Sequence, residues 1–228
     1  MRIFFKAMIL WMPVVFVLMG KVASAETSSA ENSSRPAASV QRAVLYEEDP
    51  VDPNGKRYVG SVIWRTETMS PGSGQQHELA ISADIEVPER KLAVTWSLHR
   101  NNDRTLPASH VVEIMFKLPA DVPSGSVANV PGLLIRPADQ ASGVALAGIA
   151  VKVTGAYFMI GLSNTEAEKQ RNLGLLNESG WIHIPIVYGN KRRAILASER
   201  ARPAPACSTR FLLHGDNISP HIPAGAPR

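Results

Sequence analysis

Residues 46–60, YEEDPVDPNGKRYVG, contain a dense group of oxygen-bearing side chains. Carboxylate and amide oxygens are the ligands that Ca2+ prefers. A calcium loop of the EF-hand type also needs an oxygen donor at its first position, glycine at its sixth and a carboxylate at its twelfth. With Gly55 as the sixth residue, Pro50 and Ser61 occupy the first and twelfth positions, so this type of loop is excluded.

Two interpretations of this stretch are left. We expect a β-hairpin in which AVLYEE (43–48) pairs with KRYVGSVIW (56–64) across the turn DPNG (52–55), because proline and Asn-Gly favour tight turns. The alternative is a looser metal site that combines Asp49 and Asp52 with backbone carbonyl oxygens. The hairpin is the prediction, and no metal is expected.

Other chemistry-bearing residues show no motif spacing. The histidines lie at 77, 99, 110, 183, 214 and 221, and none has a second His or Cys at metal-ligand spacing. Neither the G-x-S-x-G nucleophile turn nor a phosphate-binding glycine motif occurs. The single cysteine, Cys207, allows no intramolecular disulfide, and nothing near it in the sequence activates it. We therefore expect no cofactor.

The first 25 residues have the layout of a secretory signal peptide. Two basic residues precede an apolar run over 7–20, and Ala23-Ser24-Ala25 forms a small-residue cleavage pattern. The run contains Pro13 and is shorter than the about 20 apolar residues that a membrane-spanning helix needs. We expect cleavage after Ala25 and a periplasmic or secreted product. The alternative is an inner-membrane anchor formed by 1–25.

The formal net charge of +4 comes from the two ends of the chain. Without residues 1–25 and the arginine-containing segment 200–228, the stretch 26–199 is close to neutral. A nucleic-acid-binding domain would instead carry a clustered basic face with aromatic residues for stacking. The one basic cluster, 191–193, follows Gly189-Asn190 and predicts a solvated hairpin turn. We therefore expect no nucleic-acid partner.

Strict alternation of apolar and polar residues predicts strands across the middle of the chain. HELAISADIEV, KLAVTWSLHR and HVVEIMFKL each place their apolar residues on one face, as half-buried antiparallel strands do. The short PERK between the first two indicates a hairpin. Further strands are expected at 43–48, 56–67, 144–154, 157–162, 181–188 and 191–198, with a shorter one at 132–136.

One helix is expected within SNTEAEKQRNLGLLNES (163–179). Ser163 and Glu166 have the spacing of a capping box at its start. Gly174 lies inside it and costs about 1 kcal/mol relative to alanine, so the helix should be short and packed against the domain.

These elements predict a mainly β fold, either an antiparallel β-sandwich or a partly open barrel, with one short helix. The expected order is a signal peptide (1–25), a flexible Ser/Ala-rich leader (26–42), a single β-rich domain (43–199) and a disordered Pro/Arg-rich tail (200–228). Trp96 lies on a regular apolar face and should be core, whereas Trp64 and Trp181 could line a ligand groove.

A likeness to known proteins rests on five segments: LYEEDPVDPNGKRYVGSVIWRTE, LPASHVVEIMFKLPADVPSG, NVPG, VKVTGAYFMIGLS and NKRRAILASE. Together they resemble an uncharacterised exported protein family of rhizobia and related alphaproteobacteria, over about residues 45–199. In its layout of strands and helix the chain is also loosely similar to the invasion-associated locus B family. The resemblance implies an exported β-rich protein and no particular activity.

We therefore expect an exported envelope protein that is a non-enzymatic binding module for another envelope protein or a cell-surface component. The alternative is a periplasmic hydrolase or metal-dependent enzyme whose site only the fold reveals, since catalytic residues can come from scattered positions. A flat apolar patch or an open sheet edge would favour the binding module. A deep pocket with converging acids, or a histidine near aspartate and serine, would favour the enzyme.

Overall fold

The computed structural model describes residues 40–69, 78–122, 125–137 and 142–200. The expected signal peptide, nearly all of the expected leader and the tail beyond residue 200 lie outside these residues. In the described ranges no helix is long and apolar enough to cross a membrane.

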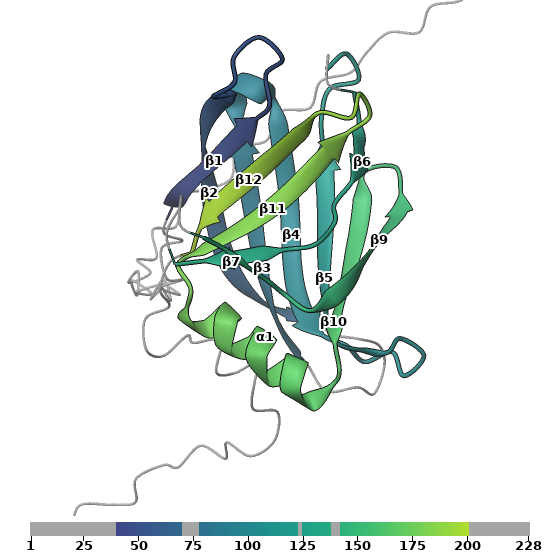
Figure 1. The fold of residues 1–228 in the computed structure, drawn as a ribbon. Helices are drawn as coiled ribbons and strands as arrows, with labels where there is room; N and C mark the ends of the chain where they lie inside the picture. Colours follow the sequence, from purple (N-terminus) through teal and green to yellow (C-terminus); the bar gives the residue numbers. More distant parts are fainter. Residues whose placement is uncertain (1–39, 70–77, 123–124, 138–141, 201–228) are drawn as a thin grey trace, which may run out of the picture. The chain divides into compact units, whose positions relative to one another are not determined.

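The described chain forms one antiparallel sheet, one α-helix and one short 3-10 helix (Figure 1). The elements in chain order are β1 (Val40–Glu47), β2 (Lys56–Met69), β3 (Glu78–Val87), η1 (Pro88–Arg90), β4 (Leu92–Arg100), β5 (Ala108–Lys117), β6 (Val127–Asn129), β7 (Leu134–Arg136), β8 (Val144–Ala145), β9 (Gly148–Thr154), β10 (Tyr157–Ser163), α1 (Glu166–Glu178), β11 (Trp181–Tyr188) and β12 (Arg193–Glu199).

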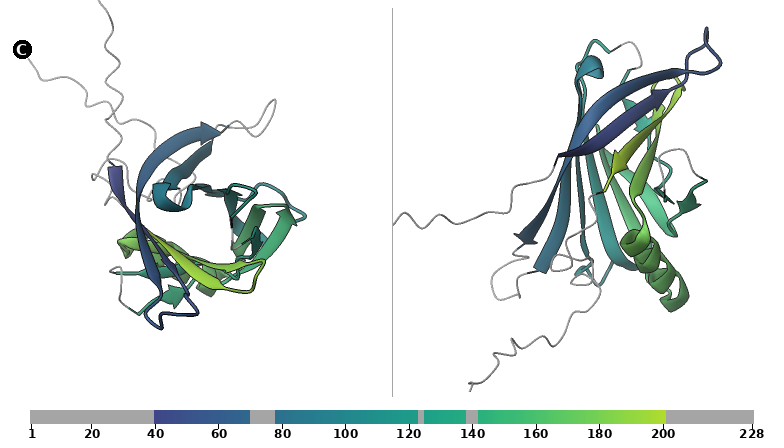
Figure 2. Two further views of the ribbon diagram at one scale, coloured as in Figure 1. Left: turned by 90° about the horizontal axis from the view of Figure 1, so that it is seen from above. Right: turned by 90° about the vertical axis from the view of Figure 1, so that its left-hand side faces the viewer.

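The sheet curls into a half-barrel, which confirms the mainly β prediction and its partly open barrel alternative (Figure 2). The strand order is β8-β7-β11-β12-β1-β2-β3-β4-β5-β10-β9, and β6 pairs with β11. The first strand, β1, lies between β2 and the last strand, β12, with Ala43 opposite Ser198 and Glu47 opposite Ala194. The curl therefore depends on a pairing between the two ends of the domain.

The two ends of the sheet meet where β8 continues into β9. Ala145 pairs with Leu134 of β7, and Gly148, three residues later, pairs with Leu162 of β10. Between them the Ser163 amide donates to the Ala147 carbonyl at 3.0 Å. Further along, β9 and β6 do not pair with each other in the described chain. The barrel is thus closed at the β8–β9 junction, and it is open between β9 and β6.

The helix α1 is fixed to this junction by a buried amide. The Oδ1 atom of Asn172 accepts from the Ala147 amide at 2.9 Å, and its Nδ2 donates to the Ala147 carbonyl at 2.8 Å. Leu173 and Leu176 are buried beside Asn172. Asn172 thus satisfies both the N–H and the C=O group of Ala147, which are partly withdrawn from water.

Several expected boundaries differ from the structure. β1 begins at Val40, three residues before the expected start at 43. The strand expected at 144–154 is divided into β8 and β9, and the three-residue β6 was not expected. The capping box was wrong, because Ser163 still pairs with Ala108 as the last residue of β10 and Thr165 is the N-cap.

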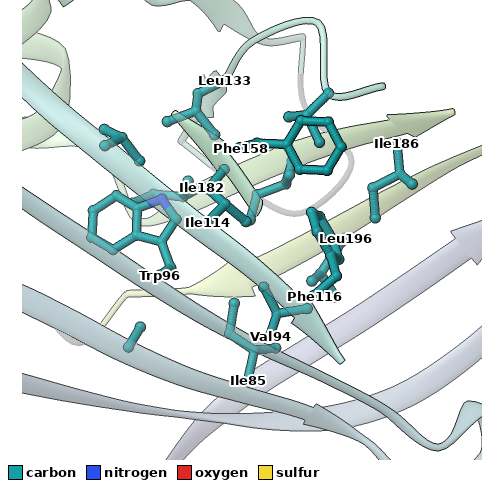
Figure 3. Packing of buried hydrophobic residues seen from close by; sticks show 14 of the residues in the cluster. Ile85, Val94, Trp96, Ile114, Phe116, Leu133, Phe158, Ile182, Ile186 and Leu196 are labelled. Atoms are coloured by element: carbon teal, nitrogen blue, oxygen red, sulfur yellow. The ribbon is translucent and has the colours of Figure 1, made fainter. Parts of the chain in front are cut away.

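The core lies between the inner faces of the curled sheet (Figure 3). Trp96 is only 2% exposed, which confirms its expected place in the core. It packs edge-to-face against Trp64 with ring centroids 5.3 Å apart. Phe116 and Phe158 form a second such pair at 5.7 Å. Aromatic pairs of this geometry add about 0.5–1.5 kcal/mol beyond the area they bury.

A buried carboxylate connects three parts of the sheet near one end. Glu47, at the end of β1, is 6% exposed. The Tyr188 hydroxyl of β11 donates to its Oε1 at 2.7 Å, and Arg90 Nε of η1 lies 3.1 Å from its Oε2. The Arg90 guanidinium also lies over the Tyr58 ring, 5.3 Å from its centroid. Burial, together with the bond to Glu47, raises the pKa of Tyr188.

We predict that Tyr188→Phe lowers the free energy of unfolding by about 1–3 kcal/mol, because a buried charged acceptor loses a donor. The measurement is urea unfolding followed by circular dichroism. The matched control is Tyr157→Phe, whose hydroxyl donates at 2.6 Å to Glu113, a carboxylate in a partly exposed setting. A loss for Tyr188→Phe no greater than that for the control would contradict this role of Glu47.

Candidate binding site

The acidic stretch is the turn between β1 and β2. Glu47 pairs with Lys56 as the last rung of the ladder, which confirms the expected hairpin. The Gly55 amide donates to the Asp52 carbonyl at 2.9 Å. Gly55 has φ +70°, and a Cβ there would lie 2.5 Å from the Glu47 carbonyl oxygen. Only glycine fits this turn without rearrangement.

The two carboxylates considered as metal ligands serve the turn itself. Asp49 is 2.7 Å from Lys56 Nζ and accepts from the Val51 amide at 3.0 Å. The hydrogen bond from Lys56 is the largest cause that lowers the pKa of Asp49. Asp52 accepts from the backbone amide of Asn54 at 2.9 Å and from its side chain at 3.1 Å. No group of three or more metal-ligating side chains occurs among the described residues.

The basic cluster 191–193 lies at the largely exposed turn between β11 and β12, as expected, and it is also bonded to the acidic loop. Glu48 Oε1 accepts from Arg193 Nε at 2.6 Å, and Oε2 accepts from the Arg193 amide at 3.0 Å. The bond from the Arg193 amide is the largest cause that lowers the pKa of Glu48. Arg192 Nε donates to the Glu48 carbonyl at 3.0 Å. The basic cluster holds the acidic loop in place.

An open hollow of about 710 Å³ lies between the two turns; we call it the turn hollow. Both turns extend from the same end of the sheet (Figure 1). The apolar part of its lining includes Tyr46, Pro131, Pro185, Val187 and Ile195. The charged part comprises Glu47, Glu48, Asp49, Asp52, Lys56, Arg192 and Arg193.

The apolar lining comes from the outer face of the sheet. Ile184, Ile186 and Leu196 point into the core, so Pro185 and Ile195, which alternate with them, face outward. The same alternation in WIHIPIVY places Trp181, His183, Pro185 and Val187 on one face. This was the signal from which sequence reasoning could have found the outward apolar row.

The expected groove-lining tryptophans lie elsewhere. Trp64 donates from Nε1 to the Glu199 carbonyl at 2.8 Å and packs on the core through Trp96. Trp181 is buried in a small second cluster with Val44 and Ala197 on the outer face. The Arg42 guanidinium lies 5.0 Å from the centroid of its ring. Neither tryptophan lines the turn hollow.

A serine, a histidine and a glutamate that sequence reasoning did not connect meet on the outer face of β4, β5 and β10. Glu113 accepts from Tyr157 at 2.6 Å and from Ser97 at 3.3 Å, and His99 Nε2 lies 3.9 Å away. His99 Nδ1 is 2.9 Å from the Arg100 carbonyl. A hydrolytic triad needs the hydroxyl bonded to the imidazole. Here the hydroxyl donates to the carboxylate, so the arrangement does not activate a nucleophile.

The chain matches no protein-family model, no curated protein and no solved structure. The resemblance to an exported alphaproteobacterial family therefore stays a prediction, and the site is interpreted from its geometry alone.

We predict that calcium does not bind at the acidic turn. The Asp49 carboxylate is already paired with the Lys56 ammonium group, and the Asp52 carboxylate already accepts the Asn54 amide. Titration calorimetry of the protein produced without residues 1–25 should show no saturable heat with Ca2+ at concentrations of about 10 μM to 1 mM, the range of sensor and extracellular sites. Saturable binding that disappears in Asp52→Ala would overturn this and restore the metal alternative.

We predict a loss of stability at alkaline pH that depends on Tyr157. Burial, with the bond to Glu113, raises the pKa of Tyr157 from 10.0 to about 12. Below pH 10.0 the folded and unfolded chains both keep the phenol proton, so its contribution is fully present. Between pH 10.0 and about 12 the unfolded chain loses the proton first, and the contribution falls.

The measurement for Tyr157 is the difference in unfolding free energy between the wild type and Tyr157→Phe as a function of pH. This difference should shrink across the alkaline window, and ultraviolet titration should show one late phenolate step that the variant lacks. A difference independent of pH would show that the hydrogen bond to Glu113 is not maintained in solution.

Proposed function

We propose that this chain is an exported binding module that takes an extended segment of a partner protein into the turn hollow. The partner would be another envelope protein or a cell-surface component. The observation that carries the proposal is the apolar lining of an open hollow between two turns held by ion pairs.

The apolar lining supports binding of an apolar side chain. Pro185 and Pro131 lack backbone N–H donors, so the hollow presents little competing hydrogen bonding at these positions. An apolar side chain that leaves water here gains about 1.5–3 kcal/mol. One or two such side chains on an extended segment provide binding in the weak to moderate range.

The charged lining supports recognition of a peptide backbone. Glu48 is paired with Arg193, and Asp49 is paired with Lys56. Arg192 is bonded to a carbonyl oxygen, and among the described residues it has no carboxylate within ion-pair distance. A guanidinium in this position can donate to a second carbonyl oxygen or to a carboxylate of a bound segment.

The pre-formed geometry also supports the proposal. Arg192 and Arg193 join the two turns and Lys56 closes the β1–β2 turn on Asp49 without a ligand, so little side-chain ordering is left to oppose binding. Export of the module rests on the signal-peptide pattern of residues 1–25.

The test compares Ile195→Glu with Val59→Glu. Ile195 lines the turn hollow, whereas Val59 is 52% exposed on the same face of the sheet and does not line it. A displayed random-peptide library is panned on the mature protein, and the enriched peptides are measured by calorimetry. We expect Ile195→Glu to weaken binding by about tenfold or more, since a carboxylate replaces an apolar contact. Val59→Glu should bind as the wild type does.

Equal binding by both variants, or the absence of any enriched peptide, would refute the turn hollow as a binding site. Mass spectrometry of the peptides after incubation provides a second outcome, because cleavage of a bound peptide would favour the hydrolase alternative. Circular dichroism of each variant checks that the fold is retained.

A further inference from the structure

The outer face of the sheet over β5, β10 and β9 is apolar around one carboxylate. These strands are neighbours in the strand order (Figure 1), and Glu113 is their only acidic residue. Met159 of β10 pairs with Glu113 on one side and with Val151 of β9 on the other. The residues around Glu113 on this face, which we call the outer apolar face, are Met115, Ile149, Val151, Tyr157 and Met159.

The outer apolar face is accessible to a partner. Met115 is 47% exposed and Val151 is 54% exposed. The outer face of an antiparallel sheet ordinarily carries polar side chains, so neighbouring exposed apolar residues indicate a contact surface. Methionine side chains suit such a surface, because they adapt their shape to what they touch.

The carboxylate of Glu113 has hydrogen-bond donors but no strong cation beside it. It accepts from the Tyr157 hydroxyl at 2.6 Å and from the Ser97 hydroxyl at 3.3 Å. His99 Nε2 lies 3.9 Å away, and a neutral imidazole adds no charge. In the described ranges no lysine or arginine lies within ion-pair distance of it. A carboxylate has about four acceptor positions, so about two stay open toward solvent.

Outward charges on the neighbouring strands are paired within the chain. Arg65 of β2 is bonded to Asp84 of β3 and lies 3.5 Å from Glu67. Arg65 and Glu113 are at the two ends of one cross-strand row that runs through Ser82 and Ser97. Three strand spacings of this row amount to about 14 Å, which is too far for an ion pair. Glu113 therefore lacks the kind of partner that Asp84 has.

We propose that the outer apolar face binds a partner protein through an arginine of that partner, whose guanidinium donates to Glu113. The stem of the arginine would lie on Met115 and Met159, and its charge would meet the open oxygen positions of the carboxylate. A guanidinium matches a carboxylate in geometry, is weakly hydrated and stacks on aromatic rings such as that of Tyr157. None of these residues lines the turn hollow, so this contact is independent of the function proposed for the hollow.

The test is methionine-methyl NMR of the protein produced without residues 1–25, which retains Met69, Met115 and Met159. The probes are the blocked peptides Leu-Arg-Leu and Leu-Gln-Leu, at about pH 8, where imidazole groups are neutral. We expect Leu-Arg-Leu to shift the Met115 and Met159 signals saturably, with Met69 of β2 as the unchanged reference. Leu-Gln-Leu should bind at least about tenfold more weakly, because it lacks the charge.

The matched variants are Glu113→Gln and Glu67→Gln. Glu113→Gln keeps an acceptor for Tyr157 and Ser97 but removes the charge, so Leu-Arg-Leu should bind at least about tenfold more weakly. Glu67 is also an outward carboxylate bonded to a serine hydroxyl, and Glu67→Gln should bind as the wild type does. Ile195→Glu, in the turn hollow, should leave these shifts unchanged.

Three results would overturn the proposal. They are the absence of a saturable shift with Leu-Arg-Leu up to about 5 mM, equal binding of the two peptides, and unchanged binding by folded Glu113→Gln. The comparison of the two peptides uses the wild type alone, so it stays decisive if a variant fails to fold. Circular dichroism checks the fold of each variant.

Discussion

The buried carboxylate of Glu47 is the interaction on which the end of the sheet that carries the turn hollow depends. A charge removed from water is tolerated only when partners compensate for its lost hydration. Arg90 supplies the opposite charge and Tyr188 a short hydrogen bond, and these residues belong to η1 and β11. Glu47 itself ends β1 between Lys56 and Ala194. One side chain therefore holds together the two hairpins whose turns enclose the hollow.

The acidic side chains of the neighbouring turn mainly stabilise the turn itself. Asp49 and Glu48 each have a basic partner, and Asp52 caps its own turn. Arg192 is the exception, since its bond goes to a neutral carbonyl. The turn hollow therefore presents an apolar surface with a largely compensated charged margin, which suits a peptide better than a metal ion.

The half-barrel is closed at one part of its edge and open at another. At the β8–β9 junction the edges meet, and Asn172 satisfies both backbone groups of Ala147. Farther along, β9 leaves the closed side and its outward row faces water. An antiparallel sheet that curls without full closure must keep an edge, and here Lys152 of β9 crosses the open side to the Val127 carbonyl of β6.

Local patterns in the sequence determined much of the fold. The alternation in 78–118 predicted β3, β4 and β5, and it placed Trp96 in the core, because side chains of a strand point to opposite faces in turn. Turn chemistry predicted the β1–β2 hairpin, since Asp52 and Asn54 are bonded to each other within the turn and Gly55 supplies its positive φ.

Only the tertiary structure decided which strands meet. The pairing of β1 with β12, the contact of Glu48 with Arg193 and the turn hollow join residues far apart in the chain, and no local pattern specifies such partners. The capping box failed for the same reason, because pairing of Ser163 with Ala108 outweighed the local helix signal. The sequence by itself determined strands, faces and turns, whereas closure of the sheet decided the candidate site, because register between distant strands is set by how the whole core packs.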